Sequence, residues 1–365
     1  MRSVLKVPFS NPAPDFDELT SVVKGEKKAE RVHFVELGID PEIVNHILEE
    51  FLDEKPVKSP LDEFETFYRQ RIEFWYRMGY DYIRVAGGLD FPRAKHKQAE
   101  DTALLSRGAR SWIDEGSGVI SSWKDFEEYP WPKPESIVFS HYEFVSKNLP
   151  GGMKMMVCPS SGVFEICSEE LLGFEGMSYL IHDDPNLVEA VFNRVGELIY
   201  EFYKNLVTLE GVGGFFQGDD LGFKTSTIIS PALLRKLVLP WHKKFAALAH
   251  KHNKMYWLHS CGNLVEIEKD LINDVQIDAL HSFQDAIMPV VEFKKRCGDQ
   301  VAALGGVDMD RLCRSDEEEL RRYVREILKN CMPIRYALGS GNTVANYVPV
   351  KNYLIMLDEG ARWIR

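Results

Sequence analysis

The sequence predicts an α/β protein of the (β/α)₈ TIM-barrel class, and three observations support this. From Tyr80 onward, short apolar runs alternate with long amphipathic segments, most runs end in small or polar residues, and helix-start signals follow them. This alternation is typical of parallel strands joined by helical crossovers. The chain has 365 residues, of which 45% are hydrophobic. It can therefore bury one large core, as α/β barrels of this length do.

The candidate strands are seven apolar runs at 82–85, 155–158, 214–217, 255–258, 277–280, 301–304 and 334–338. An eighth strand is not evident, and residues 117–150 are the remaining place for it. Helix starts are better marked. Asp184-Pro185 and Ser230-Pro231 each place a capping side chain before a proline in the first helical turn. Ser315, with Glu318 three residues later, forms a capping box.

Two arrangements fit this alternation, namely a doubly wound open sheet and a closed barrel. A dinucleotide-binding open sheet should carry G-x-G-x-x-G after its first strand, and Gly87-Gly88-Leu89-Asp90 does not supply it. The repeated polar strand ends favour the barrel. We expect residues 1–78 to form an N-terminal helical extension and residues 79–365 to form the barrel. An aromatic-rich insertion at about 91–150 is expected to cap the barrel mouth.

Composition argues against several classes of function. The net charge is −12, and the basic stretch 93–97 is better explained as a solvated loop, so we expect no nucleic-acid partner. No run of eighteen apolar residues occurs, so we expect no membrane span. The first fifteen residues lack the apolar core of a signal peptide, and the six cysteines lack CxxC spacing. A cytoplasmic protein with mostly reduced thiols is expected.

The motif His259-Ser260-Cys261-Gly262 ends one of the predicted strands. A spacing of two on an extended segment places the imidazole and the thiol on the same side. These two groups together suit Zn²⁺, although a third ligand must come from another strand end. The alternative is a polar strand end with a buried thiol.

Acidic residues follow two other candidate strands. Asp219 and Asp220 are adjacent, so only one should face the barrel mouth, where it can bind metal or act as acid or base. Helix capping or a salt bridge is the alternative. Glu165 is a candidate for the missing metal ligand or for a substrate contact, and otherwise a solvent-facing residue of a first helical turn.

Arg84 lies inside an apolar run, and an arginine that points into a barrel needs an anionic partner. That partner is either a protein carboxylate, which we favour, or a substrate carboxylate. His281 is a candidate ligand or proton shuttle, with a hydrogen-bonded structural role as the alternative. His242, His250 and His252 are expected at the surface. The predicted substrate contacts at the strand ends are Arg84, His281, Gln284, Asp308, Ser340 and Asn342.

The order of these motifs resembles the uroporphyrinogen decarboxylase superfamily, over about residues 150–365. The segments that carry the resemblance are Gly218-Asp219-Asp220-Leu221-Gly222, Ser230-Pro231, Leu258-His259-Ser260-Cys261-Gly262-Asn263, Gly305-Gly306-Val307-Asp308 and Leu338-Gly339-Ser340-Gly341. The resemblance implies a (β/α)₈ barrel. It also implies one of two activities, namely cofactor-free decarboxylation of uroporphyrinogen or zinc-dependent methyl transfer involving a corrinoid protein.

The methyltransferase branch is the closer match, because its His-x-Cys motif corresponds to His259 and Cys261. The arginine-rich N-terminal motif of the decarboxylases is absent. Ser340 stands where some of these methyltransferases carry a second cysteine, which leaves Glu165 or Asp220 to complete the zinc site. The resemblance therefore implies zinc, methylcobalamin on a corrinoid protein supplied in trans, and a small methyl donor. An aryl methyl ether, as used by an O-demethylase component, is the leading specific expectation.

Two other functions remain open. The first is a metal-free decarboxylase of a polycarboxylate, in which Arg84 and Arg93 hold carboxylates. The second is a non-catalytic barrel that binds a corrinoid or a partner protein. Neither the methyl donor nor the oligomeric state follows from the sequence.

Overall fold

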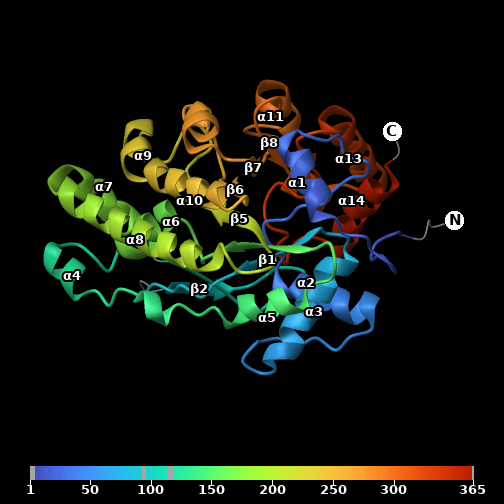
Figure 1. The fold of residues 1–365 in the computed structure, drawn as a ribbon, viewed down its shortest axis with the longest axis horizontal. Coiled ribbons are helices and arrows are strands. Elements are labelled where there is room, and N and C mark those ends of the chain that lie inside the picture. Colours follow the sequence, from blue (N-terminus) through green and yellow to red (C-terminus); the bar gives the residue numbers. More distant parts are fainter. Residues whose placement is uncertain (1–4, 93–95, 114–117, 364–365) are drawn as a thin grey trace.

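The computed structural model describes residues 5–92, 96–113 and 118–363. Its main sheet has seven parallel strands in the order β1-β4-β5-β6-β7-β8-β9, so each pairs with the next strand of this sheet, and the hairpin β2-β3 lies outside it. The helices lie around this curled sheet (Figure 1). The strands are β1 (Tyr82–Ala86), β4 (Lys154–Cys158), β5 (Val212–Gly218), β6 (Met255–His259), β7 (Ala279–His281), β8 (Ala302–Leu304) and β9 (Tyr336–Ala337).

All seven strands lie at or beside the predicted apolar runs, and the alternating α/β pattern is confirmed. The helices before β1 are α1 (Phe16–Lys24), α2 (Pro41–Leu52) and α3 (Phe64–Arg77). Those between β4 and β6 are α6 (Val163–Glu165), the π-helix η2 (Ile166–Leu171), α7 (Phe174–Asp183), α8 (Pro185–Leu206), α9 (Pro231–Leu237) and α10 (Leu239–Lys251). The later ones are the π-helix η3 (Asp270–Val275), α11 (Val290–Cys297), α12 (Met309–Arg314), α13 (Glu317–Cys331) and α14 (Val350–Arg362).

The predicted caps explain where several helices begin. The Asp184 side chain accepts a hydrogen bond from the Leu187 amide at the start of α8, and Ser230 accepts one from Leu233 at the start of α9. The start of α13 differs by one residue, since Asp316 rather than Ser315 is the cap. None of the helices in the described ranges is long and apolar enough to span a membrane.

An N-terminal segment occupies the position of the eighth strand. Phe34 and Ile39 form parallel bridges with Leu338 and Val344, beyond the end of β9. The Val35 amide donates to the Leu338 carbonyl at 2.8 Å. The proposed location among residues 117–150 is wrong, because the described part of that segment holds α4 (Trp123–Glu128), the 3₁₀ helix η1 (Pro134–Ser136) and α5 (Ser140–Asn148).

Closure between this segment and β1 is made by a side chain. No backbone hydrogen bond joins residues 33–39 to β1 in the described ranges. Instead, the Tyr82 hydroxyl donates to the Glu36 carbonyl at 2.6 Å and accepts from the Glu36 amide at 2.9 Å. The wall of the barrel therefore has a lateral gap beside β1.

The insertion at 91–150 also contains an antiparallel hairpin, β2 (His96–Glu100) and β3 (Ala109–Ile113). Asn346, which follows β9, donates to Asp101 at 2.8 Å and accepts a hydrogen bond from the Leu105 amide at 3.2 Å. Part of the insertion thus lies at the end of the barrel where the strands finish. The cap over the mouth remains a prediction.

Candidate functional site

The register of three neighbouring strands places the polar strand ends side by side. Gly218 of β5 is paired with His259 of β6, which is paired with His281 of β7. The residues that follow these positions are therefore neighbours at one edge of the sheet. Asp220, Cys261 and Ser282 meet there.

Asp220, His259 and Cys261 form a group that can hold a metal ion. One ligand atom from each lies within 4.8 Å of the other two. The His259 Nε2 atom is 3.5 Å from Cys261 Sγ and 3.5 Å from Asp220 Oδ1. Tetrahedral zinc ligands at ordinary bond lengths lie about 3.4 Å apart, so these spacings fit zinc. Three protein ligands also leave the fourth position open, as in catalytic zinc sites.

His281 determines which nitrogen of His259 is free to bind metal. The His281 Nε2 atom lies 3.2 Å from the Ser340 carbonyl, which can only accept, so Nε2 carries the hydrogen. Burial lowers the pKa of His281 well below its ordinary value, so its ring is neutral. Its Nδ1 atom then accepts from His259 Nδ1 at 2.7 Å. This leaves the lone pair of a neutral His259 on Nε2, which faces Asp220 and Cys261.

The Cys261 thiol is held by several neighbours. Asn342 Nδ2 donates to its sulfur at 3.2 Å, and Ser282 Oγ lies 3.7 Å away. Burial and the charge of Asp220 raise the pKa of Cys261 to about 12, so a bound cation is needed to stabilise its thiolate. Gly262 has φ +84°, and a Cβ there would lie 2.2 Å from a backbone carbon of Gly222. Only glycine allows this close approach of the two loops.

Asp220 is the third member of this group. Burial alone would raise its pKa, but the contact with His259 and the hydrogen bond from the Cys261 amide (2.8 Å) outweigh that effect, so the net shift is downward. The carboxylate is therefore ionised at neutral pH, as metal binding requires.

Glu165, the other predicted ligand, is not a member of this group. It lies in α6, where Ser161 Oγ donates to its carboxylate at 2.7 Å. Burial, together with the charges of Asp219 and Asp220, raises the pKa of Glu165 to about 8. A carboxyl group with this pKa is largely protonated at pH 7, which suits an acid rather than a metal ligand.

Asp219, predicted as a catalytic group, occupies a structural position. It is fully buried, and its carboxylate accepts hydrogen bonds from the Phe164 and Glu165 amides (3.1 and 3.0 Å). Its Oδ2 atom also lies 2.9 Å from Nε2 of His242. The alternative interpretation of Asp219, as a residue that caps a helix, fits these hydrogen bonds to the first turn of α6.

His242 was expected at the surface, and this is wrong, because it is fully buried. Its Nδ1 atom lies 2.6 Å from the Tyr256 hydroxyl. The missed signal is its spacing, since His242 falls on the same helical stripe as the buried Val238, Phe245 and Ala249.

Replacing Asp219 with asparagine is expected to lower the free energy of unfolding by at least about 2 kcal/mol. The amide NH₂ would face hydrogen-bond donors and leave buried groups without partners. Urea denaturation measures the change. Asp316→Asn is the matched control, because it is an exposed cap where asparagine serves equally well. Equal stability of the two variants would contradict the structural role of Asp219.

Ser340 lies outside the metal group, and its hydroxyl donates to the buried carboxyl of Glu36. The Ser340 amide donates to the same carboxyl at 2.9 Å, while burial raises the pKa of Glu36 to about 8. Sequence reasoning missed Glu36, since it interrupts a short apolar run in a region predicted to be helical. Ser340 therefore positions β9 and His281 rather than a metal ion.

Arg84 has no carboxylate partner among the described residues, which corrects the preference for a protein ion pair. Its guanidinium donates to Cys158 Sγ at 2.9 Å and lies over the Phe216 ring, 5.8 Å from the centroid. The Phe216 ring is in turn 5.7 Å from the His281 ring. Arg93, the other predicted carboxylate-binding arginine, lies outside the described residues.

A cavity of about 470 Å³ opens beside the metal group, lined by Cys261 together with Gln284 and Asp308. Gln284 thus lies where a substrate contact was predicted. The Asp308 carboxylate accepts hydrogen bonds from the Asp310 and Arg311 amides (2.9 and 3.2 Å) as the cap of α12. The exposed ring of Phe223 also lines this cavity.

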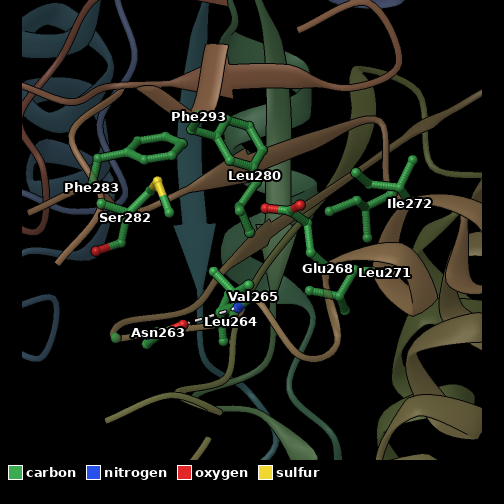
Figure 2. Close-up of a pocket in the computed structure, with 13 residues that line it drawn as sticks. Asn263, Leu264, Val265, Glu268, Leu271, Ile272, Leu280, Ser282, Phe283 and Phe293 are labelled. Atoms are coloured by element: carbon green, nitrogen blue, oxygen red, sulfur yellow. Dashed lines mark hydrogen bonds between the residues drawn. The ribbon is translucent and has the colours of Figure 1, made fainter. Parts of the chain in front are cut away.

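A second, apolar pocket lies behind the loop that carries Cys261. Figure 2 shows Leu264, Leu280 and Phe293 around it, with the Val265 amide bonded to Asn263 Oδ1 at 3.1 Å. Its volume is only about 20 Å³, room for about one water molecule. The substrate is therefore expected in the larger cavity.

Comparison with known proteins bears on family and fold. No curated protein matches the sequence significantly. A methyltransferase from Methanosarcina mazei is similar in structure, with 16% identity and a TM-score of 0.66 over 94% of this chain and 97% of that one. Two B12-independent methionine synthases score lower. The putative one from Listeria monocytogenes has 10% identity and a TM-score of 0.44 (97% and 98% covered), and the one from Shewanella sp. W3-18-1 has 13% and 0.45 (82% and 87%).

The first similarity supports the fold, which is that of a TIM-barrel-like α/β protein. The family evidence comes from the sequence. The model of the uroporphyrinogen decarboxylase (URO-D) family matches residues 118–363, which is more than half of the chain. This range includes the strand ends that carry Asp220, His259 and Cys261. The chain belongs to the uroporphyrinogen decarboxylase family.

Proposed function

We propose that this protein is a methyltransferase that moves a methyl group from a small methylated donor to the corrinoid of a separate protein. The observation that carries the proposal is the group of Asp220, His259 and Cys261, whose ligand atoms lie within 4.8 Å of one another beside an open cavity. The similarity in fold to a methyltransferase supports it. An aryl methyl ether is the donor we favour, as in an O-demethylase.

Zinc would be held by His259 Nε2, Cys261 Sγ and an oxygen of Asp220. When bound there, zinc supplies Lewis acidity to the heteroatom that loses its methyl group. The protein fixes the lone pair of His259 through His281, and it supports the sulfur through Asn342 and Ser282. Hydrogen bonds of this kind, made to the ligand side chains by their neighbours, orient metal ligands and tune their basicity.

Glu165 is the proposed proton donor to the departing oxygen or nitrogen. Burial is the largest cause of its raised pKa of about 8 and keeps the carboxyl protonated at neutral pH, and the charge of the buried Asp219 adds to this effect. Ser161 holds the carboxyl in place. This assigns to Glu165 the acid role that the sequence suggested for Asp219 or Asp220.

The methyl acceptor is expected to come to the mouth of the barrel. The cavity of about 470 Å³ lies on the loops after β5 to β8, so a docked partner can reach Cys261 from that side. We expect this partner to be a corrinoid protein supplied in trans.

The test combines metal analysis with a transfer assay. After exhaustive dialysis the wild-type protein should retain about one zinc per chain. With a reduced corrinoid protein and a panel of methyl ethers and methylamines, the absorption spectrum should change from cob(I)alamin to methylcobalamin. Absence of stoichiometric zinc, or no methylation with any donor, would refute the proposal.

One observation favours a second candidate, the decarboxylation of a polycarboxylate without metal. Arg84 lies inside the barrel without an acidic partner among the described residues and is therefore free to hold a substrate carboxylate. Release of CO₂ from a porphyrinogen by dialysed, zinc-free protein would establish this alternative.

A further inference from the structure

A separate cavity of about 390 Å³ lies at the lateral gap of the barrel. One side of it is formed by residues 37–39 and by residues 83–86 of β1, the two segments that lack a backbone ladder between them. Residues of α2 and α3 form the other side. The cavity is thus distinct from the one that Cys261 lines at the mouth.

The charged side chains that line this cavity are all cationic. Three cationic side chains, Lys58, Arg71 and Arg84, line it, and no aspartate or glutamate is among the described residues that do so. The acids at the start of α2 are already engaged, because Arg107 binds Asp40 at 2.6 Å and Glu42 at 3.0 Å. The cavity therefore presents an excess of positive charge.

None of the three cations forms an ion pair with a described residue. Arg71 donates to the neutral amide oxygen of Asn45 at 2.9 Å and stacks on the Phe67 ring, 4.6 Å from its centroid. Its Nη1 atom is buried and has no hydrogen-bond partner. Burial also lowers the pKa of Arg71 to about 10, as expected for a cation without a counter-charge.

The remaining walls of the cavity are apolar and aromatic. The rings of Phe67, Tyr68 and Trp75 line it. Arg84 reaches from the cavity to Phe216, whose ring packs against His281 of the candidate metal site.

We propose that this lateral cavity binds the carboxylate of a small aromatic molecule. Planar guanidinium groups bind carboxylates in bidentate fashion, and aromatic walls suit a flat ring. Arg71 and Arg84 hold the carboxylate, and Lys58 adds charge at the exposed edge. This binding does not depend on the proposed function, in which the methyl donor occupies the separate cavity beside Cys261.

The test is isothermal titration calorimetry on the full chain with two matched probes, 4-methoxybenzoate and its neutral analogue 4-methoxybenzamide. The benzoate should bind at least about tenfold more tightly, because charge-assisted hydrogen bonds are lost in the amide. Arg71→Met should weaken benzoate binding about tenfold and leave amide binding unchanged. Arg84→Met is the second variant, with a thermal melt to establish that it folds.

Arg69→Met is the matched control, because Arg69 lies on the same helix but is exposed and contacts Asn148 and Glu65. No benzoate binding, equal affinity for both probes, or equal effects of Arg69→Met and Arg71→Met would overturn the inference. The titration needs neither zinc nor a corrinoid protein. Benzoate binding would therefore support the lateral cavity whether or not the protein transfers methyl groups.

Discussion

Replacing Cys261 with serine or Asp220 with asparagine is expected to remove zinc from the dialysed protein and abolish methyl transfer. Each substitution leaves only two good ligands of the three whose atoms lie within 4.8 Å of one another. Loss of a residue that only hydrogen-bonds to a metal ligand costs about 10- to 100-fold in metal affinity, so loss of a ligand itself should cost more than about 100-fold. Metal analysis and competition with a chromophoric chelator measure both variants.

Ser340→Ala is the control for this prediction. Ser340 stands where some of the methyltransferases that the sequence resembles carry a second cysteine, yet its hydroxyl is bonded to Glu36 and is not part of the metal group. The alanine variant should retain zinc. If it loses as much zinc as Cys261→Ser does, the ligand set is different from the one proposed.

The pH dependence of zinc binding tests the role of Cys261 separately. Its thiol has a pKa of about 12, so binding zinc as thiolate at neutral pH must release a proton. Apparent affinity should therefore rise about tenfold per pH unit between pH 6.5 and 8 from this group alone. Cys261→Ser should lose that part of the slope. A slope equal to that of the wild type would exclude the thiolate as a ligand.

The sequence predicts the barrel well, because strand-end glycines and capped helices are local signals. It fails for the eighth strand, since residues 33–39 are short, contain a buried glutamate and pair with residues that lie far along the chain. No local pattern marks such a pairing.

The same holds for the candidate site, where the sequence predicts residues that lie close together in the chain but not roles that depend on contacts between distant segments. His259 and Cys261 follow from spacing within one strand end. The choice between Asp219 and Asp220 depends on which carboxylate is captured by the amides at the start of α6, 54 residues away from Asp219. Arg84 is the clearest case, because only the folded structure shows that no acid among the described residues pairs with it.

The raised pKa of Glu165 gives the second large prediction. As a general acid, Glu165 must be protonated, so the rate of methyl transfer should be constant below pH 8 and fall above it. Glu165→Gln should lower kcat by about 100-fold or more and abolish the alkaline fall, since glutamine neither donates this proton nor titrates. Pre-steady-state methylation of the corrinoid protein from pH 6 to 9.5 measures both effects.

The stability of the Glu165→Gln variant distinguishes a role of Glu165 as general acid from a purely structural role. A carboxyl whose pKa is raised in the folded state, here from 4.5 to about 8, binds its proton more tightly when folded. The raised pKa therefore stabilises the folded protein fully below pH 4.5. This stabilisation is lost progressively as the pH rises from 4.5 through 8. Above pH 8, neutral glutamine should leave the protein as stable as the wild type or more so. Glu175→Gln, on the exposed face of α7, should change neither rate nor stability. A slow Glu165→Gln variant that is also unstable at pH 8.5 would mark Glu165 as structural, whereas a slow and stable one assigns it to the chemistry.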